Sequence, residues 1–211
     1  MLNANFRRAI QQAWDRETWN AVSVSPELAT AAMRNIYTAP DFVKTNEAVT
    51  DGNKVFPANT DYGDVVEYYL KNVYGRKVDI ADGQDGWYHP GEALKFMRKA
   101  KAALEEEGKW NGKVKIEVVY NSQDDNDTMS KKAFETVIEE ILGDYIDVVC
   151  LPAANEEDQL ATSYDTESGD QACYDISWDS GWGPDYGDPS TYVDTFLSGG
   201  EGYMCKVIGL Y

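Results

Sequence analysis

The sequence contains few residues of the kinds that build metal centres and disulfide frameworks. Histidine occurs once, at His89, and cysteine three times, at Cys150, Cys173 and Cys205. A single imidazole has no second histidine with which to form a zinc site, and we interpret His89 as a surface or helix-start residue. Three cysteines without a CxxC pair form no even disulfide framework, although one pair could bridge in an oxidising compartment. We therefore expect no metal site and no cofactor.

Basic residues are also scarce, with 19 Lys and Arg against 37 Asp and Glu, for a net charge of −18. Phosphate binding needs clustered cations, so this balance argues against nucleic acid and anionic membrane surfaces as partners. No apolar run approaches the roughly 18 residues of a membrane span. The segment Met1–Arg8 contains no apolar signal core and no cysteine for lipid attachment. As written, the chain would be soluble and unexported, or a piece excised from a longer protein.

The 211 residues suffice for one domain with a hydrophobic core, and their periodicities predict an α/β fold. Helices are expected over residues 5–19, from Ser25-Pro26 onward, 65–73, 90–107, from Asp127 or Thr128 to 141, 156–164 and 189–197. Strands are expected over 113–120, 145–151 and 174–178, and long loops over 40–61 and 79–89. The alternation of strand and helix predicts a mostly parallel central sheet with flanking helices.

The sequence contains no recognisable catalytic motif. A GxSxG elbow, a P-loop and a GxGxxG turn after a strand are all absent. Two acidic loops, Asp79–Asp85 and Asp124–Asp127, suggest calcium, but neither follows the EF-hand order of ligands. Solvated loops and a helix cap explain both.

The most informative segment is 177–191, SWDSGWGPDYGDPST, which directly follows the third expected strand. It supplies two flexible glycines, two aromatic rings and a carboxylate, at Gly181, Trp182, Gly183, Asp185 and Tyr186. In α/β sheets, ligands bind at the carboxyl ends of the strands. A carboxylate among aromatic rings at that place suits a cationic group such as an amine. A glycine-rich turn with packed aromatics explains the same residues equally well.

Several motifs together resemble the large lobe of extracellular solute-binding proteins of the oligopeptide ABC-transporter family, family 5. Residues 5–16 are similar to the family's NxxFRxAIxxAxDR helix, and 93–108 to its AkxxLxxAG helix. Residues 114–121 with the helix after them resemble its LxLxYNxxD strand and helix. Residues 174–189 resemble its YDixxxGWgpDYxDPxtfL signature, while 81–86 and 206–211 look most like Gram-positive members.

The resemblance implies the substrate-binding component of an ABC importer, with two lobes that close around an oligopeptide. Residues 1–211 would then be a single domain, the C-terminal or large lobe, truncated at both ends. The full-length parent would be a monomeric extracellular lipoprotein that works with membrane permease subunits. Because the lipobox, the first lobe and the terminal crossover are missing, this piece alone would bind peptide weakly or not at all.

The resemblance also implies roles for individual residues. Asp185 would pair with the α-ammonium of the peptide, with Gly181, Trp182 and Gly183 beside it and Tyr186 in the pocket wall. Asn121, at the end of the first parallel strand, would lie near the cleft. One alternative keeps the fold and changes the ligand to a sugar, a metal chelate or a signalling peptide. Another is an acidic hydrolase that uses Asp185 and Asp188, although Asp188 also suits the N-cap of a helix that begins at Pro189. We expect a binding protein and not an enzyme.

Overall fold

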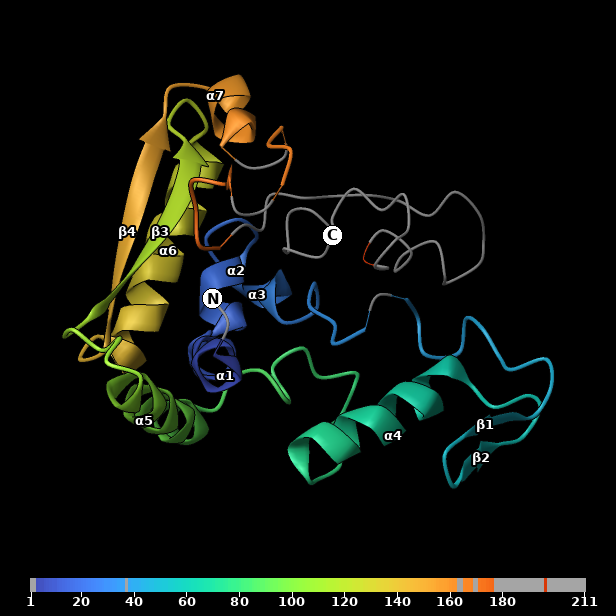
Figure 1. The fold of residues 1–211 in the computed structure, drawn as a ribbon. Coiled ribbons are helices and arrows are strands. Elements are labelled where there is room, and N and C mark those ends of the chain that lie inside the picture. Colours follow the sequence, from blue (N-terminus) through green and yellow to red (C-terminus); the bar gives the residue numbers. More distant parts are fainter. Residues whose placement is uncertain (1–2, 37, 163–164, 169–170, 177–195, 197–211) are drawn as a thin grey trace.

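The computed structural model describes residues 3–36, 38–162, 165–168, 171–176 and 196 (Figure 1). The chain forms α1 (Ala4–Ala13), α2 (Arg16–Asn20), α3 (Pro26–Ala29), β1 (Val49–Asp51), β2 (Lys54–Phe56), α4 (Tyr62–Tyr74), α5 (Pro90–Glu106), β3 (Val114–Asn121), α6 (Asp125–Leu142), β4 (Ile146–Ala153) and α7 (Glu156–Ala161). None of the described helices is long and apolar enough to cross a membrane.

The sheet beneath the hydrophobic core is the parallel pair β3 and β4, joined through α6 and drawn at the left of Figure 1. The register runs from Val114 opposite Ile146 to Asn121 opposite Ala153. Side chains alternate across β3, so that Ile116 and Val118 face the core and are at most 1% exposed. Both strands and their parallel order agree with the sequence prediction, and the α/β class is confirmed.

The helix α6 packs on this sheet, and α1 and α5 pack on α6 and on each other to close one hydrophobic core. Its buried members come from all three helices and both strands, and the largest include Phe6, Met97, Ile116, Phe134, Ile138 and Leu142. The apolar stripes of α5 and α6 were visible in the sequence, and both helices lie where predicted. However, the cap of α6 is Asp124, because its side chain accepts hydrogen bonds from the N–H groups of Asn126 and Asp127. The prediction of a cap at Asp127 or Thr128 is therefore wrong.

The prediction of a single helix over residues 5–19 is wrong, because the chain forms α1 and α2 with a break between them. Trp14 leaves the helix with an extended backbone (φ −78°, ψ 98°). Asp15 then caps α2 by accepting the Thr18 N–H at 3.1 Å. The Asp15 side chain thus takes a backbone N–H group that a continuous helix would bind to a backbone carbonyl, and the first helix ends before it. The break brings the rings of Trp14 and Trp19 into an edge contact at 5.4 Å.

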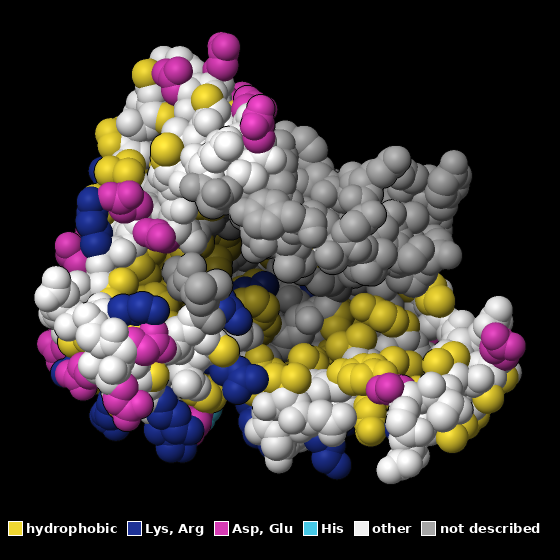
Figure 2. All heavy atoms as spheres, viewed as in Figure 1, with side chains coloured by type: hydrophobic (Ala, Val, Ile, Leu, Met, Phe, Trp, Pro, Cys, Tyr) yellow, Lys and Arg dark blue, Asp and Glu magenta, His cyan; other side chains and the backbone are white. Residues whose placement is uncertain are grey.

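The long loop predicted over 40–61 is also partly wrong, because it contains the antiparallel hairpin β1–β2. Strands of three residues are too short to show a period in sequence, and only Gly52, at φ 56°, marks the turn. The hairpin packs on α4 through Phe56 and Tyr68, whose ring centroids are 5.3 Å apart. The helix α4 ends at the left-handed Gly75 as predicted. Exposed apolar side chains gather over this part of the molecule (Figure 2), at Phe42, Val49, Val55, Tyr69 and Val73.

The remaining predicted elements differ from the structure in their ends or their assignment. Ser25 makes no side-chain cap and α3 spans only four residues, while α7 ends before the predicted 164. Residues 174–176, expected to begin a third strand, have no strand assignment. They nevertheless lie beside β3, since the Asp175 N–H donates to the Glu117 carbonyl at 2.8 Å. Residues 177–178 and the helix expected over 189–197 lie outside the described residues, except for residue 196.

Candidate functional site

The parallel strands end together, and a cavity of about 390 Å³ opens at that edge. We call it the edge cavity. It lies where β3 passes into α6 and β4 passes into α7, and Trp19 and Ser23 approach it from the N-terminal region. Carboxyl ends of parallel strands are the usual place for ligands in α/β folds, because loops there present polar groups on a rigid support.

Asn121 is the sequence-predicted site residue that the structure describes, and it lines the edge cavity. Its Oδ1 accepts the Gln123 N–H at 3.0 Å. Its Nδ2 has no hydrogen-bond partner among the described residues, so one amide donor remains available to a ligand. The other predicted site residues, Gly181, Trp182, Gly183, Asp185 and Tyr186, lie outside the described part of the chain.

The end of β3 is fixed by a carboxylate that the sequence did not single out as a site residue. Asp127 Oδ2 accepts the Asn121 N–H at 2.7 Å and the Gln159 Nε2 at 3.1 Å. One side chain therefore ties β3, α6 and α7 together at the cavity. Asn121 and Gln159 lie 6 and 32 residues away from Asp127 in the chain. The local pattern of acidic and polar residues does not indicate either contact.

The charge of Asp127 is balanced inside the protein by Lys131, one helical turn later on α6. The Lys131 side chain is 1% exposed, and its ammonium pairs with Asp127 Oδ1. Because both groups are withdrawn from water, the pair is held by its geometry and by the further hydrogen bonds on Oδ2. Asp127 therefore brings no uncompensated charge to the cavity.

The first N–H groups of α6 and α7 are bound by their own caps. Asp124 Oδ1 accepts from Asn126 N at 2.8 Å and from Asp127 N at 3.2 Å, and Asn155 Oδ1 accepts from Asp158 N at 2.9 Å. Free N–H groups at a helix start would attract an anion, and here the caps occupy two of these groups on α6 and one on α7. Glu156 and Asp124 stand exposed at the rim. The described lining contains three carboxylates and no Lys or Arg, so the site favours neutral or cationic groups.

An aromatic ring closes one side of the edge cavity. The Trp19 Nε1 donates to the Ser130 carbonyl at 2.9 Å, which fixes the indole against the first turns of α6. Ser130 itself is 7% exposed. Trp19 became available to this site only because the chain breaks at Trp14 and Asp15.

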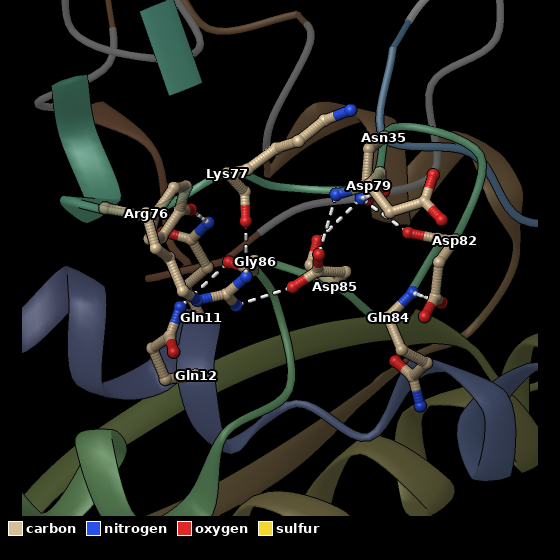
Figure 3. Close-up of polar contacts among 11 residues, drawn as sticks. Gln11, Gln12, Asn35, Arg76, Lys77, Asp79, Asp82, Gln84, Asp85 and Gly86 are labelled. Atoms are coloured by element: carbon tan, nitrogen blue, oxygen red, sulfur yellow. Dashed lines mark hydrogen bonds and ion pairs between the residues drawn. The ribbon is translucent and has the colours of Figure 1, made fainter. Parts of the chain in front are cut away.

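The acidic loop Asp79–Asp85, with its neighbours Arg76 and Gly86, is organised around Asn35 (Figure 3). Asn35 Nδ2 donates to the carbonyls of Asp79, Asp82 and Asp85 at 3.3, 2.5 and 2.6 Å. The Arg76 guanidinium bonds to Asp85 at 2.5 Å and holds the pKa of that carboxyl below its usual value.

The carboxylates of this loop serve its own backbone. Asp79 Oδ1 accepts the Ala81 N–H and Asp82 Oδ1 accepts the Gln84 N–H, each at 2.9 Å. Within the described ranges, no group of three His, Cys, Asp or Glu side chains is arranged to hold a metal ion. The loop is thus built as a set of Asx turns, and Gln12 of α1 and Arg16 of α2 bind its backbone carbonyls.

Comparison with known proteins gives consistent matches, although no family model matches the chain. Oligopeptide-binding protein AliB of Streptococcus pneumoniae is 31% identical over 207 residues, which are 97% of this chain and 29% of the relative. AmiA of the same species is 32% identical over 92% of the chain and 28% of its own length. SarA of Streptococcus gordonii is 32% identical over 95% of the chain and 29% of its own length. The chain thus spans less than a third of the length of these relatives.

Solved structures share the fold. The substrate-binding domain of an oligopeptide ABC transporter from Bacillus anthracis superposes with a TM-score of 0.53 at 21% identity, over 96% of this chain and 30% of that one. Listeria monocytogenes OppA bound to peptide gives 0.53 at 20% identity, over 97% of this chain and 31% of that one. These structures confirm the fold class, and the sequence relatives above confirm the resemblance inferred from the motifs.

Proposed function

Since this chain is a relative of the solute-binding proteins of oligopeptide ABC transporters, we propose that it supplies one wall of an oligopeptide-binding site in the substrate-binding component of an importer. The observation that carries the proposal is similarity along 97% of the chain to a protein named for oligopeptide binding. The relatives are substrate-binding proteins and not enzymes. This similarity argues against the acidic hydrolase that would use Asp185 and Asp188.

The edge cavity supports this proposal by its position and chemistry. It opens at the carboxyl ends of β3 and β4 and offers the free Asn121 Nδ2 beside exposed carboxylate and amide groups. An extended peptide presents backbone N–H and C=O groups that such side chains can bind without regard to sequence. Main-chain recognition of this kind suits an importer that accepts many peptides.

The finer part of the proposal assigns the peptide amine to Asp185. It rests on the motif GWGPDY at residues 181–186 and on the charge-assisted hydrogen bonds that a carboxylate makes to an ammonium group. Trp182, with Gly181 and Gly183, would lie beside the amine, and Tyr186 would support the wall.

The larger assembly follows as part of the same proposal. Because the chain spans 29% of AliB, we propose that residues 1–211 form a single lobe and that residues outside it complete the site. The complete protein would be monomeric, tethered outside the cell as a lipoprotein, and would deliver peptide to membrane permease subunits.

Nuclear magnetic resonance titration of the ¹⁵N-labelled 211-residue chain tests the proposal, because it detects weak binding. The probes are Ala-Ala-Ala and its N-acetylated form. We expect the free-amine peptide to shift backbone resonances near Asn121 and to bind about tenfold more tightly than the acetylated one, which corresponds to ~1.4 kcal/mol for the ammonium contact.

The matched variants are Asp185→Asn, which removes the proposed amine ligand, and Asp188→Asn, which retains a capping side chain. Asp185→Asn is expected to weaken binding of the free-amine peptide and to leave binding of the acetylated peptide unchanged. Asp188→Asn is expected to change the binding of neither peptide. Equal losses for both peptides in Asp185→Asn would overturn the amine role. Absence of any shift with either peptide would show that this lobe does not hold peptide by itself. The same two peptides and variants would then be compared in the full-length protein, where a lack of binding would overturn the proposal. A sugar or metal-chelate ligand would raise the melting temperature where peptides leave it unchanged.

A further inference from the structure

We propose that the edge cavity is a side-chain subsite that selects lysine or arginine in the bound ligand. This inference rests on the proposed peptide-binding function and adds a substrate class to it. The cavity of about 390 Å³ is near the lower end of small-molecule pockets. Its volume suits a single long side chain and not a folded peptide.

The first argument is the balance of charge in the lining. Among the described lining residues the ionisable groups are Asp124, Asp127 and Glu156. The buried Lys131 forms an ion pair with Asp127. Glu156 has no ion-pair partner in the described ranges. Asp124 uses Oδ1 for its cap and leaves Oδ2 at the rim. Two negative charges therefore face the cavity without a cation.

The second argument is that the described lining offers an anion few donors and no cation. The Asp124 cap binds the N–H groups of Asn126 and Asp127, and the Asn155 cap binds that of Asp158, so the helix ends offer fewer donors to a carboxylate or phosphate. A ligand anion would meet two carboxylates and find no side-chain cation. The cavity therefore discriminates against acidic side chains as well as attracting basic ones.

The third argument concerns the neutral part of a basic side chain. Lysine and arginine carry an apolar stem that needs a surface of its own. Trp19 supplies that surface on one wall, and its indole is fixed by the hydrogen bond to the Ser130 carbonyl at 2.9 Å. The arrangement places an aromatic ring beside carboxylate oxygens, as suits a cation on a hydrocarbon stem.

The expected selectivity is modest because Asp124 and Glu156 are exposed. Exposed ion pairs contribute at most about 1 kcal/mol each and weaken with salt. We therefore expect about fivefold tighter binding of a lysine peptide than of its norleucine counterpart at low ionic strength. Added sodium chloride should reduce the preference.

The test uses Ala-Lys-Ala against Ala-Nle-Ala, with the ¹⁵N resonance of the Trp19 indole as the local probe, assigned by Trp19→Phe. The double variant Asp124→Asn/Glu156→Gln removes the rim charges and keeps an N-cap. The matched control is Asp125→Asn/Glu157→Gln, which removes two exposed charges one residue away that do not line the cavity. We expect the preference for lysine to fall below twofold in the first double variant and to persist in the second.

Equal binding of the two peptides by the unmodified chain would overturn the subsite and leave peptide binding intact. If neither peptide binds, N-acetyl-lysine methylamide and N-acetyl-norleucine methylamide test the cavity by itself, since neither has a free α-amine. A Trp19 indole shift with the capped lysine alone then supports the cation subsite even though the peptide proposal fails. No difference between the capped compounds overturns the subsite.

Discussion

Lys131 and Asp127 form an ion pair one turn apart on α6, in which the side chains are 1% and 11% exposed. The second oxygen of the carboxylate binds the N–H of Asn121, where β3 ends. The buried ammonium therefore holds the carboxylate that in turn fixes the strand end at the edge cavity. This relationship connects the stability of the fold to the geometry of the site.

Lys131→Met is expected to lower the free energy of unfolding by about 3 kcal/mol, because it leaves the Asp127 carboxylate buried without its counter-ion. Urea denaturation followed by circular dichroism measures the change. The same variant should alter the amide resonance of Asn121, whose N–H is bound by that carboxylate.

The matched control is Lys132→Met, at an exposed position on the same helix, where we expect a change below about 0.5 kcal/mol. The double variant Lys131→Met/Asp127→Asn should recover part of the loss, since it removes the unpaired charge. A Lys131→Met variant as stable as the Lys132→Met control would contradict the role given to the pair.

Cys150 on β4 should be unreactive in the folded protein. Its partial burial, together with Glu135, raises the pKa of the thiol to about 12, and the thiolate is the reactive form. In a Cys205→Ser background at pH 8, we expect Ellman's reagent to modify the exposed Cys173 promptly and Cys150 only after urea is added.

The raised pKa also has a consequence for stability. The folded state holds the Cys150 proton more tightly than the unfolded state does. The resulting contribution to the free energy of unfolding is complete below ~8.5, the pKa of the thiol in the unfolded chain, and is lost as the pH rises from there toward the folded value. Urea denaturation at increasing pH should show a fall in the free energy of unfolding, and Cys150→Ala should remove the part of that fall which the thiol causes. Prompt labelling of two thiols in the folded protein at pH 8 would refute the assignment.

The sequence predicted the β3–α6–β4 unit because each element carries a strong local pattern. Ile116 and Val118 alternate with polar residues, and the apolar stripe on α6 recurs at helical spacing around Phe134 and Ile138. The parallel order then followed from the connection, since a helix between two strands requires a crossover. Asn121 was placed near the cleft by the family resemblance and not by this pattern. The structure puts it at the end of β3, on the lining of the edge cavity, and its role in binding stays a prediction.

The features that escaped prediction depend on contacts between distant residues or on very short elements. The hairpin β1–β2 has three residues a strand, too few for a period to emerge. The end of α1 at Trp14 is decided by the capping of α2 at Asp15, which competes with a continuous helical pattern. The edge cavity requires Gln159 to reach Asp127 across 32 residues, and no local pattern contains that information.

The N-cap positions of α2 and α3 should respond differently to substitution. Asp15 accepts hydrogen bonds from Thr18 N at 3.1 Å, Thr18 Oγ1 at 2.7 Å and Gln84 Nε2 at 2.7 Å. Ser25 makes no side-chain cap. We expect Asp15→Ala to cost about 1–2 kcal/mol of unfolding free energy and Ser25→Ala less than about 0.5 kcal/mol. Equal costs for the two variants in urea denaturation would show that the cap of α2 is not what stabilises the break.

Gly83 lies in the loop that Asn35 and Arg16 organise, and the space around it leaves no room for a side chain. A Cβ there would lie 2.4 Å from the Cβ of the buried Met33 and 3.1 Å from its carbonyl carbon. Because backbone and a core side chain cannot both yield, we expect Gly83→Ala to lower the free energy of unfolding by about 2 kcal/mol. The variant should also disturb the bond from Arg16 Nη1 to the Gly83 carbonyl, which measures 3.0 Å.

The matched control is Gly91→Ala in the first turn of α5, where the nearest atoms to a new Cβ are 3.9 Å away in His89. Alanine there restricts the unfolded chain and favours the helix, so we expect a gain of about 0.5–1 kcal/mol. Differential scanning calorimetry should thus move the two melting temperatures in opposite directions. A Gly83→Ala variant that melts at or above the unmodified chain would mean that the 79–86 loop can move away from Met33, and that Asn35 does not hold it in place.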